Sequence, residues 1–209
     1  MLKKGVIKMK GFKGIGSRAL FIFIVFTIVC GGIYPLIMTG FAQVVFPEKA
    51  NGSLIEVEGK IYGSALLGQQ FTEGTHMWGR IMQLDTATYK DAKGNAVMYA
   101  SPANLSPASQ QFEALVAERI EKIQEAHPTK VDEAIPVDLV TSSGSGLDPG
   151  ISVAAAMYQV ERLAKNNHVS KEEVERIIAE CTNHKFLGIF GEATVNVLKV
   201  NLMLEGILK

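Results

Sequence analysis

The most prominent pattern in the chain is a long apolar run near its N-terminus. Residues 19–38 read ALFIFIVFTIVCGGIYPLIM, and no charged residue occurs between positions 19 and 47. A helix rises about 1.5 Å per residue, so about 20 residues cross a hydrocarbon core of about 30 Å. The run therefore predicts one transmembrane helix over 19–38, which Pro35 ends or kinks. No comparable run follows, so a single span is expected.

Beyond this run the spacing of apolar positions first suggests strands. Residues 54–57 and 60–67 flank the turn Glu58-Gly59 and read as a short strand pair. Residues 72–106 are rich in turn-forming residues and show little periodicity, which predicts a long irregular segment. Further along, residues 135–140 are again strand-like.

Helical spacing dominates the second half of the chain. A helix is expected to begin at Ser106-Pro107 and to stop at His127-Pro128. Ser152 is expected to cap a second helix, which ends at Asn166-Asn167, and the capping box SKEE starts a third at Ser170. The tail 194–208 is apolar on several faces and favours a buried helix over a strand.

These patterns predict an α+β fold. One N-terminal transmembrane helix is followed by a single mixed α/β domain over residues 48–209. The sequence shows no internal repeat and no further domain boundary.

Charge is distributed unevenly and indicates the orientation of the helix. The whole chain has 21 basic and 21 acidic residues, but residues 1–18 contain six basic residues and no acidic one. Basic flanks remain in the cytoplasm. We therefore expect a single-pass protein of the cell membrane, with residues 1–18 as a cytoplasmic head and residues 48–209 extracytoplasmic. The domain is mildly acidic, which argues against nucleic acid as a partner.

A cleaved signal peptide is the alternative interpretation of the apolar run. Its apolar region would be about 7–15 residues long and would precede small residues at a cleavage site. The run here is longer, and Gly40-Phe41-Ala42 is a poor cleavage site. An uncleaved anchor is therefore favoured. Cys30 in that anchor cannot reach Cys181 in the domain, so no disulfide is expected.

Small residues give the predicted helix a face that could contact another helix. Gly31 and Gly32 follow Thr27 by about one turn. Small residues let a second helix approach closely in lipid. The alternative is that glycine is simply common in membrane helices.

The sequence offers little evidence for catalysis. It contains no phosphate-loop, nucleophile-elbow or zinc-protease motif. Four histidines are scattered without ligand spacing and are expected to be solvated or capping residues: His76, His127, His168 and His184. Glu172 and Glu173 suit a helix start through their charge. We expect no catalytic residue, no metal site and no cofactor bound by this chain.

A glycine-rich segment, TSSGSGLDPGIS at residues 141–152, is the most distinctive feature of the domain. It lies between a predicted strand and a predicted helix start, which are the ingredients of an anion-binding loop. Its spacing does not match a dinucleotide fingerprint, and it has no lysine. A surface turn that caps the next helix is the favoured reading, and a partner-contact loop is the alternative.

Together with other blocks, this segment resembles the C subunit (KdpC) family of the Kdp potassium-transporting ATPases. The resemblance covers residues 18–209 and is carried by these blocks: VTSSGSGLDPGIS at 140–152, GIYP at 32–35, NGSL at 51–54, GSALLGQQF at 63–71, GR at 79–80, VNVL at 195–198 and NL at 201–202. The chain departs from the family pattern in three places. Ile81-Met82 replaces a usual Pro-Ser, residues 91–101 replace a serine- and glycine-rich stretch, and Ala193-Thr194 replaces a common arginine.

The resemblance implies a non-catalytic, single-span accessory subunit. Its implied partners are a channel-like potassium-selective subunit and a P-type ATPase subunit in the membrane. The subunit would be needed for assembly, and it has been described as a catalytic chaperone that raises the affinity of the ATPase subunit for ATP. The resemblance associates the glycine-rich loop with a partner or with nucleotide: Ser143, Gly144, Ser145, Gly146, Leu147 and Asp148.

The expected topology conflicts with direct nucleotide binding. Cytoplasmic ATP does not reach an extracytoplasmic loop, so any effect on ATP affinity would be indirect. Two other classes remain open. A membrane-tethered enzyme would need a catalytic constellation, and a tethered extracytoplasmic binding module would act without a pump.

Overall fold

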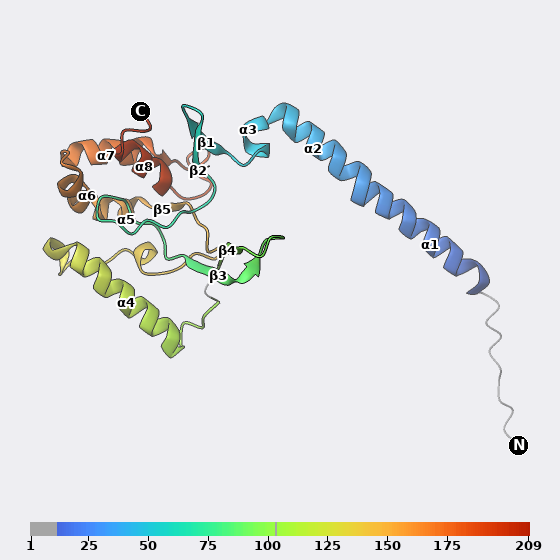
Figure 1. Ribbon diagram of the computed structural model, residues 1–209, viewed down its shortest axis with the longest axis horizontal. Coiled ribbons are helices and arrows are strands. Elements are labelled where there is room, and N and C mark those ends of the chain that lie inside the picture. The colour runs from blue at the N-terminus through green and yellow to red at the C-terminus, as the bar shows by residue number, and fades with distance from the viewer. Residues whose placement is uncertain (1–11, 103) are drawn as a thin grey trace, which may run out of the picture. The chain divides into compact units, whose positions relative to one another are not determined.

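The computed structural model describes residues 12–102 and 104–209 and divides the chain into two compact units, Met1–Gly52 and Ser53–Lys209 (Figure 1). Most of the predicted basic head, 1–18, lies outside the described residues.

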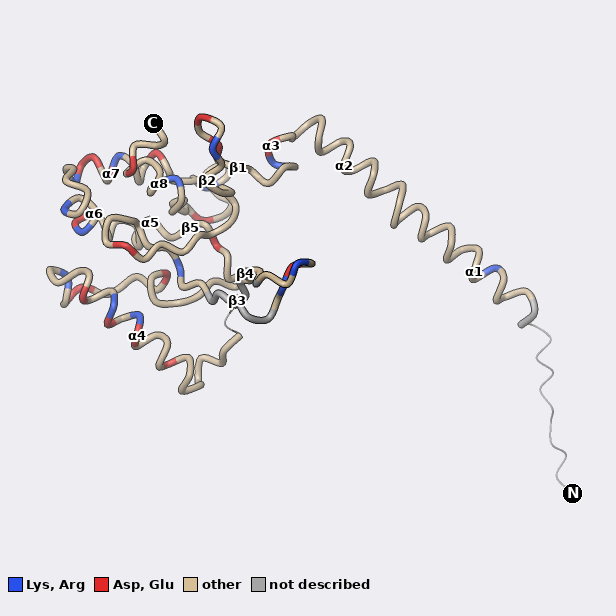
Figure 2. The backbone as a smooth tube through the Cα atoms, in the orientation of Figure 1, with Lys and Arg blue, Asp and Glu red and all other residues tan. Residues whose placement is uncertain are grey.

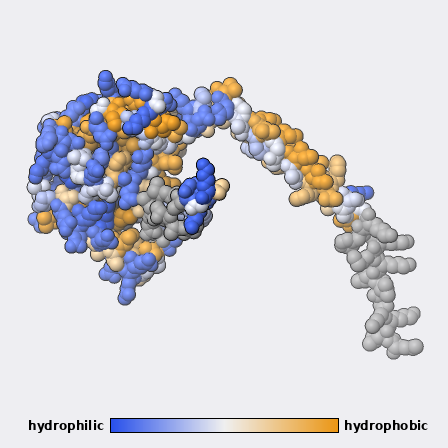
Figure 3. All heavy atoms as spheres, viewed as in Figure 1, coloured by the Kyte–Doolittle hydropathy of each residue, from blue (hydrophilic) through white to orange (hydrophobic). Residues whose placement is uncertain are grey.

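From Phe12 onward, the first unit is helical. It consists of α1 (Phe12–Ile28), the π-helix η1 (Val29–Ile33), α2 (Tyr34–Val45) and the short α3 (Pro47–Ala50). The stretch Gly14–Val45 is long and apolar enough to cross a membrane, and its apolar side chains are exposed. Arg18 is the one charged residue in that stretch (Figure 2), and the helix is predominantly hydrophobic (Figure 3). This is the arrangement of a single-pass membrane protein, and the predicted span 19–38 lies within it.

Pro35 does not end this helix, contrary to one of the two expectations. Proline has no N–H and cannot donate to the carbonyl group four residues earlier. The helix instead passes through the π-helix η1, where the Tyr34 N–H donates to the Val29 carbonyl five residues back. A π-turn of this kind lets the helix continue past an interrupted hydrogen-bond ladder.

The second unit combines short strands with five α-helices and two 3₁₀ turns among its described residues. Its strands are β1 (Leu54–Val57), β2 (Lys60–Ser64), β3 (Gln83–Lys90), β4 (Ala96–Ser101), β5 (Gly150–Ser152), β6 (Thr182–Asn183) and β7 (Thr194–Asn196). Its α-helices are α4 (Gln110–Ala126), α5 (Val153–Tyr158), α6 (Val160–Asn167), α7 (Lys171–Glu180) and α8 (Val197–Leu204). Two 3₁₀ turns, η2 (Pro128–Lys130) and η3 (Val137–Leu139), follow α4. The α+β class is therefore confirmed.

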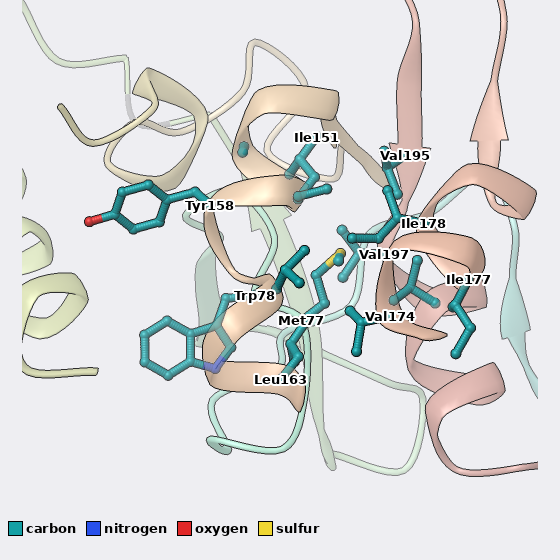
Figure 4. Packing of buried hydrophobic residues seen from close by; sticks show 14 of the residues in the cluster. Met77, Trp78, Ile151, Tyr158, Leu163, Val174, Ile177, Ile178, Val195 and Val197 are labelled. Carbon is teal, nitrogen blue, oxygen red and sulfur yellow. The ribbon is translucent and has the colours of Figure 1, made fainter. Parts of the chain in front are cut away.

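A small antiparallel sheet, ordered β5-β7-β6, joins segments that are far apart in the sequence. Ile151 pairs with Val195, and Thr182 pairs with the same residue from the other side. Apolar residues of α5, α6, α7 and α8 form the core together with Ile151 and Val195 of this sheet (Figure 4). The fully buried members include Leu163, Val174 and Val200.

The predicted strand pair at 54–67 is confirmed as β1 and β2, although β2 stops at Ser64. Glu58 and Gly59 both have positive φ, +52° and +79°. This is the backbone of a two-residue hairpin turn that matches the strand twist.

The prediction of an irregular segment over 72–106 is wrong for its second half. Residues 83–101 form the hairpin β3–β4. The Asp91 carboxylate accepts hydrogen bonds from the N–H groups of Lys93 and Asn95, both at 2.8 Å, and Gly94 adopts φ +84°. A short aspartate-glycine turn closes the hairpin, and the low periodicity of the strands concealed it.

Two element boundaries near α4 also differ from expectation. The helix starts at Gln110, capped by Ser109, because Ser106 instead closes a turn with the Ser109 N–H. The stretch 135–140 contains the 3₁₀ turn η3 and no strand. Four apolar residues in that stretch suggested a strand, but it has no neighbouring strand to pair with among the described residues.

The C-terminal helices confirm the predicted serine caps. Ser152 accepts from the Ala155 N–H, and Ser170 accepts from the Glu173 N–H. The helix expected from Ser152 to Asn166 is, however, two helices, α5 and α6, that meet at Gln159. The tail is neither all helix nor all strand, because β7 completes the sheet before α8 begins at Val197.

Candidate functional site

The glycine-rich loop is a turn stabilised by its own side chains. Ser143 Oγ accepts from the Gly146 N–H at 2.8 Å, and Ser145 Oγ accepts from the Leu147 N–H at 3.2 Å. Asp148 Oδ1 accepts from the Gly150 N–H at 3.0 Å. Gly146 adopts φ +72°, which favours glycine. Ser143 and Gly146 are buried, and Gly144 and Ser145 form the exposed tip.

The loop is also fixed against the segment that follows β2. The Gly68 N–H donates to the Leu147 carbonyl at 2.7 Å. A Cβ atom at Gly68 would lie 2.7 Å from the Asp148 carbonyl oxygen, so only glycine fits this approach. The Val197 N–H at the start of α8 donates to the Pro149 carbonyl. Two distant segments, one at Gly68 and one at the start of α8, therefore hold the loop in place.

Arg80 balances the acidic charge at the base of the loop. Its Nη1 atom lies 3.5 Å from Asp138 and 3.8 Å from Asp148, and its Nη2 donates to Thr141 Oγ1 and the Ser142 carbonyl. Asp138 in turn accepts from the Ser152 N–H. Several groups that could hold an anion are thus occupied within the domain. The arrangement suits a shaped contact surface better than a phosphate cradle.

A groove of about 170 Å³ lies beside Arg80. Arg119 and Lys122 from α4 contribute positive charge to it, and Glu118 contributes one negative charge. Arg119 donates through Nε to the Leu139 carbonyl, and burial lowers its pKa from the ordinary arginine value. The groove was not predicted. Its walls come from residues 69–71, 79–82 and 115–122, and although the blocks at 63–71 and 79–80 stood out in the sequence, nothing in the sequence placed α4 beside them.

Beneath this surface, two buried amide side chains hold an extended segment in the core. Gln159 Oε1 accepts from the Trp78 N–H at 2.8 Å, and Gln159 Nε2 donates to the Trp78 carbonyl at 3.0 Å. Asn201 makes the same two contacts with Met77, at 2.6 and 3.1 Å. Each amide pairs with the backbone of one residue as a neighbouring strand would, and no strand within 12–102 and 104–209 pairs with Met77 or Trp78. We call Gln159 and Asn201 the amide clamps.

Arg162 extends this buried network. It donates to the carbonyl groups of Gly74 and His76, to Gln159 Oε1 and to His127 Nε2, and its guanidinium lies 4.4 Å from the centre of the Trp78 ring. Burial lowers the pKa of Arg162 to about 10, so it remains charged at neutral pH. The network fixes residues 74–80, which end at Arg80 and the groove.

His127 belongs to the same network, so its expected solvated or capping role is incomplete. It does occupy the C-terminal cap of α4, but it is 3% exposed and its ring lies between Trp78 and Tyr158. Because Arg162 Nε donates to His127 Nε2, that nitrogen must be an acceptor, and Nδ1 donates to the Ile123 carbonyl. The imidazole is therefore neutral in the folded protein.

This hydrogen bond predicts a loss of stability in mild acid. Burial, and then the charge of Arg162, lower the pKa of His127 from its ordinary value of 6.5. The unfolded chain then binds more protons than the folded one below about pH 6.5, so the free energy of unfolding falls as pH drops from 6.5 toward the folded pKa. Urea midpoints at pH 8 and pH 5 should converge in a His127→Gln variant. His184→Gln, at an exposed position, should keep the full pH dependence, and equal slopes in both variants would contradict the assignment.

The described residues offer no candidate metal site, and the histidines and the buried cysteine among them have other roles. No group of three or more histidine, cysteine or carboxylate side chains lies together within 12–102 and 104–209. His76 pairs with Glu205 at 2.7 Å, and His168 ends α6 in a left-handed conformation, φ +57°. Burial raises the pKa of the Cys181 thiol to about 11, which makes it a poor nucleophile.

In the anchor, Thr27, Gly31 and Gly32 lie at and next to the π-helix η1. Thr27 Oγ1 donates to the Phe23 carbonyl at 2.8 Å, so its hydroxyl is satisfied within the helix. Apart from the neighbouring residues and the nearby backbone of the helix itself, no atom lies within 4 Å of a Cβ placed at Gly31 or Gly32. The helix thus offers a shallow face at the position predicted from the sequence.

The comparison with known proteins covers nearly the whole chain. A family model described as "K+-transporting ATPase, c chain" matches residues 17–206. The potassium-transporting ATPase KdpC subunit of Clostridium botulinum (strain Alaska E43 / Type E3) is 58% identical over 201 residues, which is 96% of this chain and 100% of that protein. The corresponding subunit of Clostridium perfringens is 59% identical over 192 residues, covering 92% and 97% of the two chains. That of Listeria monocytogenes is 44% identical over 203 residues, covering 94% and 98%. The chain therefore belongs to the KdpC family of potassium-transporting ATPase subunits.

Proposed function

We propose that this chain is the accessory subunit of an ATP-driven potassium uptake pump and has no catalytic role of its own. The family match over residues 17–206 carries this proposal. The partners would be a channel-like potassium-selective subunit and a P-type ATPase subunit, and the chain would be needed for their assembly. The internally occupied charges of the glycine-rich loop support contact rather than chemistry.

The proposed effect on ATP is indirect. A catalytic chaperone would raise the ATP affinity of the ATPase subunit, and ATP itself would bind to that subunit. An extracytoplasmic domain can do this only by favouring one conformation of its partner, that is, through a coupling free energy between separate sites. The ordered loop and its buried support are suited to such a role. A contact surface with one fixed shape binds one conformation of the partner more tightly than another.

The orientation of the domain is the part of this proposal that can be tested most simply. Cys30→Ser removes the thiol in the anchor, and Asn51→Cys then places one at an exposed position before β1. An impermeant thiol reagent added to intact cells should label Asn51→Cys. Arg18→Cys, at the other end of the apolar run, should label only after permeabilisation. The reverse result would place the domain in the cytoplasm and remove the objection to direct ATP contact.

The loop is proposed to contact a partner subunit through its exposed tip, Gly144 and Ser145, and through the half-buried Asp148. Gly146→Ala should destabilise the domain by about 1–3 kcal/mol, because alanine is strained at positive φ. Ser145→Ala should change thermal stability by less than about 1 kcal/mol, since it removes only local hydrogen bonds, with Leu147 N–H and Ser143 Oγ, at the exposed tip. Ser145→Ala and Asp148→Ala should nevertheless reduce co-purification of the pump subunits. Normal assembly with both variants would mean that the loop only shapes the domain and does not contact a partner.

The glycine face of the anchor is proposed to pack on a membrane helix of a partner subunit. Gly31→Leu and Gly32→Leu should leave membrane insertion intact, because leucine favours it and the helix itself has room for both side chains. They should weaken recovery of the partners with this chain. Leu36→Ala, at an exposed apolar position in α2, is the matched control. Full recovery with both glycine variants would mean that the glycines serve no contact.

A further inference from the structure

A strongly exposed apolar turn lies between β6 and β7, away from the loop described above. Its large side chains, Phe186, Leu187, Ile189 and Phe190, are between 62% and 76% exposed. Single exposed apolar residues are common on protein surfaces, but four within five consecutive positions form a patch of the kind that marks an interaction surface.

The turn is ordered by its own backbone. Phe186 and Phe190 exchange two N–H···O=C hydrogen bonds, both 2.9 Å, and the Gly188 N–H donates to the Lys185 carbonyl. Gly188 takes φ +72° at the tip. Lys185 and Glu192 form an ion pair at 3.0 Å, on the two sides of the apolar tip. The apolar side chains are thus presented by a defined tip with charged residues behind it.

The base of the turn lies close to the point where the domain begins. Ser53, the first residue of the second unit, accepts through its carbonyl from the Ala65 N–H at 2.9 Å. Asn196 Nδ2 donates to the Ala65 carbonyl at 2.8 Å. Asn196 ends β7, and the turn extends from the pair Asn183–Thr194 at the other end of that three-residue strand.

The surface around this entry point is apolar as well. Leu54, Ile61, Leu66 and Leu67 are each more than half exposed. The linker 46–52 separates Ser53 from the end of α2 at Val45. Eight residue steps lead from Val45 to Ser53, and a fully extended chain of that length reaches at most about 29 Å, so Ser53 is covalently tethered to the apolar helix by a short segment.

We propose that the 186–190 turn inserts into the interface of the lipid bilayer that holds the anchor helix. A narrow tip of four side chains is small for a stable protein interface, which buries about 800 Å² on each partner. Insertion into lipid needs only apolar side chains that reach the acyl boundary, with a lysine behind them at the level of the headgroups. The covalent tether keeps the bilayer within reach. The proposal does not depend on the pump and needs only the anchor in a membrane.

An environment-sensitive fluorophore can test this on the full chain. Ile189→Cys in a Cys30→Ser background is labelled with a nitrobenzoxadiazole dye at pH 7, where the buried Cys181 thiol reacts poorly. The chain is reconstituted alone in phosphatidylcholine vesicles, with and without nitroxide-labelled lipid. Val137→Cys is the matched control, because Val137 is 65% exposed on η3.

The dye at position 189 should show blue-shifted emission and roughly two-fold quenching by shallow nitroxide lipid, as expected for interfacial depth. The dye at position 137 should show neither. Water-like, unquenched emission at position 189 would overturn the proposal. So would a blue shift that appears only when other pump subunits are added and that lipid nitroxides do not quench, because the turn would then contact protein.

Discussion

Replacing Gln159 with leucine is expected to lower the free energy of unfolding by about 2–5 kcal/mol. The substitution nearly preserves side-chain size but leaves both the N–H and the carbonyl of Trp78 without the partners they have in the fold. Gln159 is fully buried, so water cannot replace them. Each buried polar group left unsatisfied costs about 1–3 kcal/mol. Asn201→Leu should produce a loss of the same size at Met77.

Urea unfolding of the detergent-solubilised full chain measures this effect, and Trp78, the chain's one tryptophan, reports it directly. Gln111→Leu is the matched control, because Gln111 is exposed on α4 and should change stability by less than about 0.5 kcal/mol. A Gln159→Leu variant as stable as this control would show that the clamp does not support the core.

Arg162→Met is expected to cost about 3–5 kcal/mol. It removes the donor of the His76 carbonyl, one of the two donors of the Gly74 carbonyl, which keeps Asn166 Nδ2, and the cation from the face of Trp78. Leaving a buried polar group without a hydrogen-bond partner lowers the free energy of unfolding far more than leaving an exposed one, which water can satisfy. Arg176→Met should cost less than about 1 kcal/mol, although Arg176 pairs with Glu173 and Glu180, because those pairs lie in solvent.

The two buried substitutions should not be additive. Arg162 donates a hydrogen bond to Gln159 Oε1, so either substitution alone already removes the contact between the two side chains. A double variant in which the two losses sum fully would show that the arginine and the amide support the core independently. Thermal unfolding of the two single variants and the double variant decides between these outcomes.

Several elements were predicted correctly from local signals, although Ser106 was expected to supply the helix cap that Ser109 supplies. The serine caps at Ser152 and Ser170, the two-residue turn at Glu58-Gly59 and the long apolar helix follow from a few neighbouring residues. The break at Gln159 could not be read this way. It depends on Trp78, a residue 81 positions away, and nothing near Gln159 in the sequence interrupts the helical pattern.

The candidate site shows the same division. The glycine-rich loop was identified from its composition, and its six residues do form one ordered turn. Its support was not predicted, because Gly68 and Arg80 reach it from other parts of the chain. His127 was missed for a related reason: burial among Trp78, Tyr158 and Arg162 is a tertiary property that a lone histidine does not reveal.

Affinity purification of the tagged full chain from membranes of potassium-limited cells tests the central claim most directly. In mild detergent, two larger polytopic proteins should elute with it, together with an ATPase activity that potassium stimulates. The purified chain alone should hydrolyse no ATP. The account would be contradicted if the chain eluted alone while the potassium-stimulated ATPase remained intact in the unbound fraction.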